Sequence, residues 1–216
     1  MNSTDILDKT VAFVQETLKN AEGGHDWWHI YRVWTNAKQI AKTEDCDVLV
    51  VELAALLHDI ADSKFHNGDE EIGPATAGKF LTEIGVSADV IVHVQQIIRY
   101  MSFKASFDKA AFHSKELAVV QDADRLDAIG AIGIARAFTY GGFKGREIYN
   151  PHIQPKLNMT KDEYKNTTAP TINHFYEKLL LLKDKMNTPT GRHLAQRRHT
   201  FMEAYLKEFY SEVAPQ

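Results

Sequence analysis

The segment Val48–Leu57 constrains the fold of this 216-residue chain more than any other segment. Nine of its ten residues are apolar, and a helix of that composition is buried on nearly all sides. The segment runs directly into the pair His58-Asp59. Charged side chains taken out of water are usually paired or bound to a metal. The sequence therefore predicts a helical core that ends in a polar pair with a binding partner.

Helical periodicity and capping residues recur along the whole chain, and no segment shows sustained alternation of apolar and polar residues. We expect helices over about residues 4–20, 26–42, 48–59, 87–100, 115–128, 130–142, 169–186 and 191–212, and one more around Pro74. Residues 143–168 are rich in Gly, Pro, Asn and Lys, which favours a long irregular loop or a lid. The pattern predicts a compact all-α fold with a C-terminal helical hairpin at about 169–213.

The composition excludes several classes of protein. A net charge of −4 argues against a general nucleic-acid-binding surface. A single cysteine, Cys46, rules out an intramolecular disulfide and a cysteine-rich zinc site. No apolar stretch reaches the roughly 18 residues that span a bilayer, and the first residues lack the basic and apolar regions of a signal peptide. We therefore expect a cytoplasmic protein that binds neither membranes nor nucleic acid.

Polar residues stand on predicted apolar helix faces at three places. His29 shares a face with apolar residues of its helix, His58-Asp59 ends the most apolar helix, and Asp124 and Asp127 lie on one side of a later helix. Two histidines and two aspartates together suit Mn²⁺, Fe²⁺, Co²⁺, Ni²⁺ or Zn²⁺. The carboxylates and the lack of thiolates favour octahedral Mn²⁺ or a similar ion such as Mg²⁺.

Each of these signals also has a simpler interpretation. A lone histidine on an apolar face is more often a hydrogen-bonded core residue than a metal ligand. A His-Asp dipeptide carries little information alone, because His25-Asp26 is a second one and fits an N-cap and an acidic residue in the first turn of a helix. The metal hypothesis depends on the whole set, which is spread over three predicted helices.

Longer stretches of sequence resemble a known family. Residues 25–33, 54–60 and 122–130, together with 102–104 and 140–142, resemble the HD-domain metal-dependent phosphohydrolases, in particular the YedJ/YpgQ-like subgroup. The resemblance covers nearly the whole chain. It implies one HD-type hydrolase domain over residues 1–216, with an HD core at about 20–140 and C-terminal helices at about 169–213.

The resemblance also implies which residues bind the metal. The ordered set of the family carries over to His29, His58, Asp59 and Asp124. Asp122 and Asp127 compete for the last position, but the Asp before Arg is the ligand in the similar guanosine-tetraphosphate hydrolase branch, which favours Asp124. Asp127 is then a group that supports a ligand or binds water, and Asp122 pairs with a base or stays solvated.

The implied activity is hydrolysis of a phosphoester or phosphoanhydride by a metal-activated water. The subgroup suggests a phosphorylated small molecule as substrate, a (deoxy)nucleoside triphosphate cut to monophosphate and pyrophosphate. A phosphomonoesterase or a signalling-nucleotide phosphodiesterase could use the same site. A non-catalytic nucleotide sensor is a further alternative, although an intact ligand set argues against it. A homodimer is compatible with the sequence, which does not indicate one.

Further roles can be assigned to residues near these motifs. Asp62 resembles the acidic residue that follows the doublet in the guanosine-tetraphosphate hydrolase branch, and it either orients or deprotonates the water or caps a turn. Lys64, Lys104 and Arg32 are candidate phosphate-binding residues. Tyr140 either stacks on a base or belongs to the core.

Overall fold

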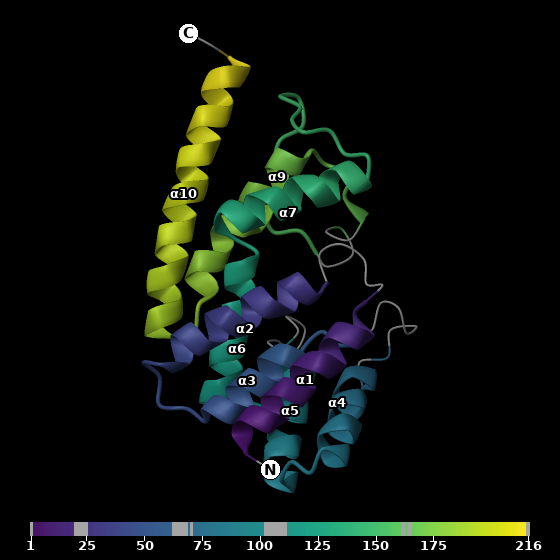
Figure 1. Cartoon of the computed structure of the whole chain (residues 1–216). Coiled ribbons are helices and arrows are strands. Elements are labelled where there is room, and N and C mark those ends of the chain that lie inside the picture. Colours follow the sequence, from purple (N-terminus) through teal and green to yellow (C-terminus); the bar gives the residue numbers. More distant parts are fainter. Residues whose placement is uncertain are drawn as a thin grey trace. The chain divides into compact units, whose positions relative to one another are not determined.

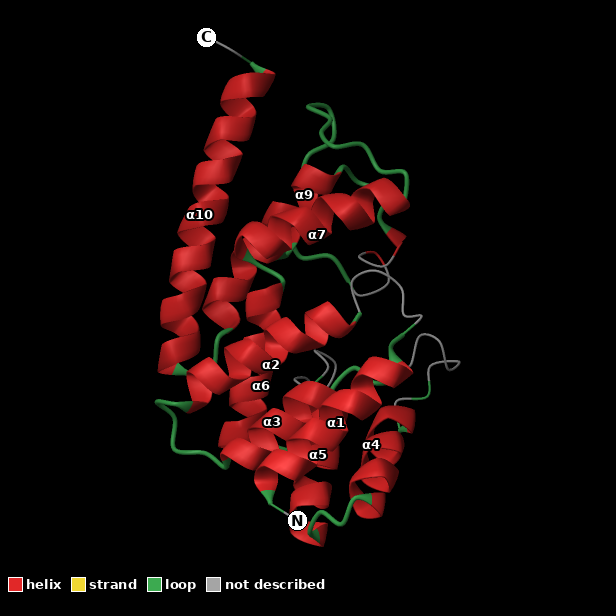
Figure 2. Ribbon diagram, viewed as in Figure 1, coloured by secondary structure: helices red, strands yellow, loops and turns green. Residues whose placement is uncertain are grey.

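The computed structural model describes residues 2–19, 26–61, 69, 71–101, 112–160, 163 and 166–214. These residues form helices joined by loops and contain no strand (Figure 2). The helices are α1 (Ser3–Thr17), α2 (Trp27–Ala41), α3 (Val48–Leu57), α4 (Ile72–Glu83), α5 (Ala88–Tyr100), α6 (Lys115–Asp127), α7 (Gly130–Phe143), α9 (Thr171–Glu177), the 3-10 helix η3 (Leu179–Lys185) and α10 (Pro189–Val213) (Figure 1). The all-α prediction is confirmed. No described helix is long and apolar enough to cross a membrane.

The chain divides into two compact units, Met1–Asp124 and Arg125–Gln216. The division falls inside α6, whose last residues belong to the second unit. The organisation of the whole chain as one HD-type domain stays a prediction, and each unit is described separately below.

Helix α3 is the centre of the first unit. Five consecutive residues, 53–57, are fully buried, and α3 contacts α1, α2 and α5. The residue before the helix, Asp47, caps it, since its Oδ1 accepts hydrogen bonds from the main-chain N–H groups of Leu49 (2.9 Å) and Val50 (3.2 Å). This N-cap satisfies two of the amides that a helix start leaves without a partner. The buried helix predicted from the apolar run is therefore present, and it carries His58 to its C-terminal end.

Helix α2 packs on α3, and its buried residues include both apolar and polar side chains. Its apolar residues Ile30, Val33, Ala37 and Ile40 are fully buried. Asp26 caps the helix, since its Oδ1 accepts from the main-chain N–H of His29 at 2.9 Å. The second His-Asp dipeptide thus provides a helix cap at Asp26, as the simpler interpretation expected.

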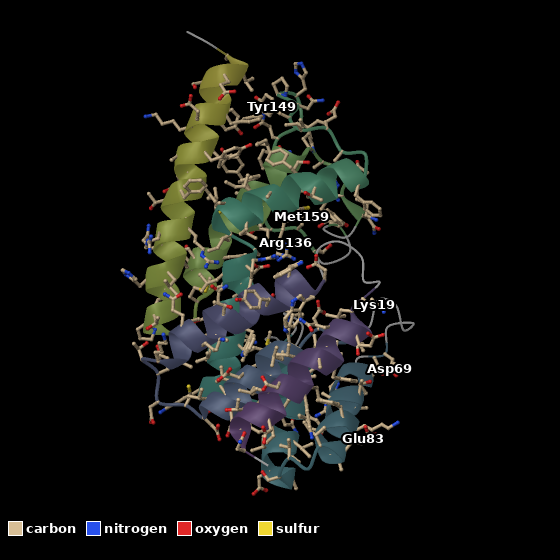
Figure 3. The ribbon with its side chains drawn as sticks, viewed as in Figure 1. Lys19, Asp69, Glu83, Arg136, Tyr149 and Met159 are labelled. Carbon is tan, nitrogen blue, oxygen red and sulfur yellow. The ribbon has the colours of Figure 1, made fainter. Side chains whose placement is uncertain are left out.

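The second unit is built around contacts of α7, η3 and α10, with α9 packed on α7 and η3. Phe175 of α9 is fully buried and stacks on Tyr205 of α10, with ring centroids 6.0 Å apart. Tyr149, in the loop before α9, packs edge-on against Phe209 (5.8 Å) and Tyr210 (5.6 Å) of α10 (Figure 3). Aromatic pairs at these separations add to the burial of their apolar area.

The first of the two helices predicted for the C-terminal hairpin differs from its prediction. The helix expected over 169–186 is split at Lys178, whose φ of −144° leaves the helical region. The leucine run that follows forms η3, and the 3-10 period of three residues aligns Leu179 with Leu182. The second arm, α10, starts at Pro189 after Thr188, whose hydroxyl accepts from the N–H of Gly191 at 2.9 Å.

The segment predicted as an irregular loop forms turns and bends over residues 144–160. Its start is tied to α9, because the N–H groups of Thr171 and Ile172 donate to the carbonyls of Glu147 (2.9 Å) and Ile148 (3.1 Å). The proposed role of this segment as a lid stays a prediction.

His174 of α9 gives the second unit a measurable pH dependence. Burial, with the charges of Lys178 and Arg146, lowers its pKa from 6.5 to about 4. The folded chain therefore keeps this imidazole neutral where an unfolded chain would protonate it. Its contribution to stability is complete above pH 6.5 and is lost as the pH falls towards 4, by at most about 3 kcal/mol.

Urea unfolding at pH 7.5 and at pH 4.5 measures how much the free energy of unfolding falls with pH. We expect this fall to be smaller for His174→Gln than for the wild type. The same substitution at the exposed His152 is the control and should leave the loss unchanged. Equal losses in the His174→Gln variant and the wild type would contradict a depressed pKa at this position.

Candidate metal centre

Three of the four predicted ligands lie together in the first unit. His29 of α2, and His58 and Asp59 at the end of α3, each offer one ligand atom, and these atoms lie within 4.8 Å of one another. Ligands on opposite sides of a transition metal are about 4 Å apart, because each bond is about 2 Å long. The cluster therefore has nearly the dimensions of a metal site.

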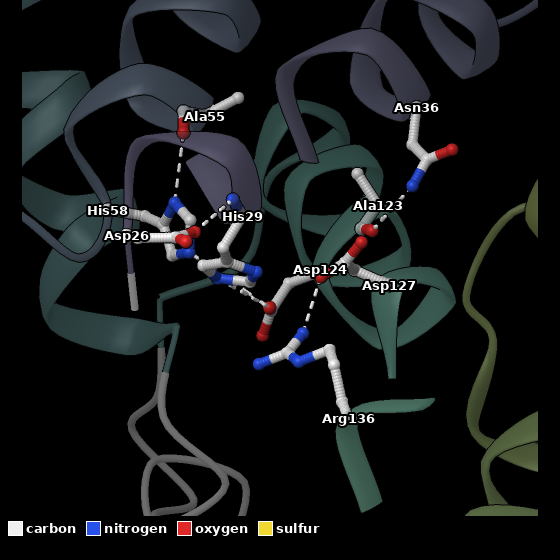
Figure 4. Close-up of polar contacts among 9 residues, drawn as sticks. All are labelled: Asp26, His29, Asn36, Ala55, His58, Ala123, Asp124, Asp127 and Arg136. Carbon is white, nitrogen blue, oxygen red and sulfur yellow. Dashed lines mark hydrogen bonds and ion pairs between the residues drawn. The ribbon is translucent and has the colours of Figure 1, made fainter. Parts of the chain in front are cut away.

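Asp124 of α6 brings a second carboxylate to the two histidines. Its Oδ1 is 3.6 Å from Nε2 of His29 and 4.0 Å from Nε2 of His58 (Figure 4). The His29 and His58 side chains are 3% and 6% exposed, whereas that of Asp124 is 43% exposed. The imidazoles thus form the buried floor of the cluster, and Asp124 lies on its solvent side.

A main-chain hydrogen bond fixes the His58 ring. Its Nδ1 is 2.9 Å from the carbonyl oxygen of Ala55, and because a carbonyl oxygen only accepts, Nδ1 is the donor of this bond and Nε2 is the nitrogen that offers a lone pair in the neutral ring. The His29 ring meets that of His58 edge-on, with centroids 5.4 Å apart. Metal-binding histidines commonly donate their second ring N–H to a carbonyl in this way. The tautomer of His58 therefore suits a metal bound through Nε2.

Asn36 supports the cluster and was not predicted. It is 7% exposed on α2, and its side-chain amide donates to the carbonyl of Ala123 at 3.3 Å. This bond holds the main chain of α6 directly before Asp124. The signal was present in the sequence, because Asn36 follows His29 by two helical turns on the same apolar face.

The two competing aspartates of α6 are buried. Asp122 is fully buried, so the solvated alternative for it is wrong. Asp127 is 1% exposed in the second unit and forms an ion pair with Arg136 of α7 (Figure 4). A guanidinium beside a buried carboxylate offsets much of the cost of removing its charge from water. The pairing with Arg136 was also missed from the sequence.

Of the other predicted catalytic and phosphate-binding residues, only Arg32 is among the residues that the structure describes. Arg32 lies on α2, partly buried and one turn after His29. Asp62, Lys64 and Lys104 lie outside the described residues, so their roles stay predictions.

Comparison with known proteins gives the cluster a context. The sequence model of the HD domain matches residues 27–129, which include all four predicted ligands. The uncharacterized protein YpgQ of Bacillus subtilis strain 168 is 38% identical over 205 residues, which cover 93% of this chain and 90% of YpgQ. The chain belongs to the HD-domain family. The resemblance seen in the sequence is thereby confirmed.

Solved structures of HD proteins share the fold along the whole chain. An HD-superfamily hydrolase from Bacillus thuringiensis is 41% identical, with a TM-score of 0.80 and full coverage of both chains. The crystal structure of B. subtilis YpgQ in complex with ADP is 37% identical, with a TM-score of 0.79 over 100% of this chain and 98% of that one. HD domains bind divalent metals, and this HD protein is a metal-dependent phosphohydrolase.

Proposed function

We propose that this HD protein hydrolyses (deoxy)nucleoside triphosphates to the monophosphate and pyrophosphate, using one divalent ion held by His29, His58, Asp59 and Asp124. The observation that carries the proposal is the cluster itself, two buried imidazoles beside carboxylates at one end of the apolar helix α3. The ADP complex of the similar YpgQ supports a nucleotide as the ligand.

The donor set favours Mn²⁺. Two imidazole nitrogens and two carboxylate oxygens suit an octahedral borderline ion, and no thiolate is present to favour a softer one. Mg²⁺, Fe²⁺, Co²⁺, Ni²⁺ and Zn²⁺ are the alternatives. When bound, the ion supplies positive charge that polarises a phosphoryl oxygen and lowers the pKa of a water molecule.

The chain itself supplies orientation and charge. The Ala55 carbonyl keeps Nε2 of His58 turned to the cluster, and Asn36 holds the main chain next to Asp124. We assign Asp62 to orienting or deprotonating the attacking water and Asp127 to supporting the ligand helix. Lys64, Lys104 and Arg32 then neutralise the phosphates of the substrate, as cations usually do in phosphoryl transfer.

Product analysis tests this function. The purified protein with Mn²⁺ is incubated with a panel of nucleoside and deoxynucleoside triphosphates, and with phosphomonoesters and cyclic nucleotides as controls. We expect monophosphate and pyrophosphate in equal amounts, and loss of turnover with EDTA that added Mn²⁺ restores. Release of orthophosphate alone would favour a phosphomonoesterase. Binding of nucleotide without any turnover would favour the sensor.

A further inference from the structure

A pocket of about 390 Å³ opens in the second unit and is lined by residues outside the segment that the HD-domain model matches. It is lined by residues 144–147 at the end of α7 and by residues 166–168 before α9. None of these residues belongs to the predicted ligand set, and none lies within the matched HD segment. The pocket therefore needs a separate explanation.

Two cations line this pocket. Arg146 is partly buried, and its Nη2 donates to the carbonyl of Thr167 at 2.7 Å. Lys144 is exposed and lies over aromatic rings. Within the described part of the chain, neither cation has a carboxylate partner. The one carboxylate in the lining, that of Glu147, accepts a hydrogen bond from the Asn150 side chain at 2.9 Å.

The end of α7 places these cations by a specific cap. Gly145 adopts the left-handed conformation (φ +64°), and its N–H donates to the carbonyl of Gly142 at 3.1 Å. The N–H of Arg146 reaches the carbonyl of Gly141 at 2.9 Å. This pair of bonds is the Schellman motif, which satisfies carbonyls at the helix end. Lys144 and Arg146 are thus held on either side of a fixed turn.

Exposed aromatic rings lie beside the cations. Tyr140 is 51% exposed and Phe143 is 71% exposed, so Tyr140 does not belong to the core. The Lys144 ammonium is 5.7 Å from the Tyr140 ring centroid and 5.1 Å from that of Phe143, and the Arg146 guanidinium is 5.5 Å from the Tyr140 centroid. Aromatic faces next to cations are a common surface for stacking bases.

A simpler explanation covers only part of this arrangement. A lysine at a helix C-terminus is favourable without any ligand, because it faces the negative end of the helix. That does not account for Arg146, which is beyond the helix, partly buried and anchored to a carbonyl. The pKa of His174 is lowered mainly by burial and further by the charges of Lys178 and Arg146, so the Arg146 guanidinium also acts on a side chain of α9.

We propose that this pocket binds the phosphate groups of a small polyphosphate anion through Arg146 and Lys144. Arg146 offers planar donors that match phosphate oxygens, and Lys144 adds a mobile point charge. The ligand is either a nucleotide, whose base stacks on Tyr140 or Phe143, or a free polyphosphate. The site does not depend on the triphosphate hydrolysis proposed above, because it shares no residue with the metal cluster.

Calorimetric titration of the full chain in EDTA tests the proposal without turnover or metal. ATP and tripolyphosphate are the two probes, and an Asp59→Ala background shows whether the metal cluster takes part. We expect both probes to bind in that background. Lys144→Ala and Arg146→Gln should each weaken binding at least about tenfold, the scale of a lost charge-assisted contact. Lys207→Ala, which removes an exposed cation from α10, is the matched control and should change nothing.

The aromatic variants separate the two ligands. If Tyr140→Ala and Phe143→Ala weaken ATP binding but not tripolyphosphate binding, the ligand is a nucleotide, and if they change neither, it is a free polyphosphate. The proposal is overturned if neither probe binds, if binding disappears with Asp59→Ala, or if Lys144→Ala has no more effect than Lys207→Ala. Within the described residues the Lys144 side chain makes ring contacts and no hydrogen bond or ion pair, so that variant decides the question even if Arg146→Gln fails to fold.

Discussion

Asp59→Ala is expected to weaken Mn²⁺ binding by more than about 100-fold and to reduce nucleotide hydrolysis to the level of the EDTA-treated protein. Replacing a residue that only supports a metal ligand typically costs 10–100-fold in affinity or activity, and Asp59 is itself one of the three clustered donors. Its alanine variant leaves the imidazoles of His29 and His58 in place but removes a negative charge that a divalent ion needs. Bound metal is measured by mass spectrometry after gel filtration, and turnover by product release.

The matched control is Asp8→Ala, which removes an exposed carboxylate from α1 in the same unit. It should retain wild-type metal content and turnover. Asp59 lies two residues beyond Leu57, the last residue of α3, so its variant should keep the far-ultraviolet circular dichroism of the wild type. Unchanged metal content and turnover in Asp59→Ala would remove this residue from the site.

Gly133→Ala is expected to destabilise the protein by about 3 kcal/mol, the upper part of the range for overpacked buried positions. A Cβ at this position of α7 would lie 2.3 Å from the carbonyl oxygen of Ala128 and 2.5 Å from its carbon. Both atoms are main-chain atoms in the turn between α6 and α7, so no side-chain rotation relieves the clash. The main chain after α6 must move instead. Urea unfolding at neutral pH measures the loss.

Gly142→Ala in the same helix is the control for this prediction. A Cβ there meets no atom within 4 Å, and alanine favours the helix over glycine by up to about 1 kcal/mol. We therefore expect the two alanine variants to change stability in opposite directions. A Gly133→Ala variant as stable as Gly142→Ala would show that the α6–α7 turn adapts without cost.

The sequence predicted the parts of the fold that depend on local pattern. The apolar run before His58 predicted a buried helix, and α3 lies at the expected position. Polar residues on apolar helix faces identified His29 and Asp124, which come from different helices and lie close together. Asn36 is also a polar residue on an apolar helix face, so the same pattern could have identified it from the sequence. The split at Lys178 was missed because a leucine run fits an α-helix and a 3-10 helix equally well.

Contacts between side chains on either side of a turn could not be predicted from the sequence. Asp127 and Arg136 are nine residues apart on different helices, and they meet only because Gly130, with φ of +77°, turns the chain between α6 and α7. Periodicity identifies a face of one helix but not the residue of the next helix that it contacts. The same limit applies to the pocket beside Arg146, which depends on a cap at Gly145 and on residues 166–168 much later in the chain.

The central claim is that His29, His58, Asp59 and Asp124 bind one divalent ion, and anomalous X-ray scattering from a crystal soaked in Mn²⁺ tests it most directly. Data collected near the manganese absorption edge locate the ion independently of the protein coordinates. We predict one strong peak per chain whose nearest protein atoms are the imidazole nitrogens and carboxylate oxygens of these four residues. A peak coordinated by other side chains, or no peak at this cluster at saturating Mn²⁺, would contradict the claim.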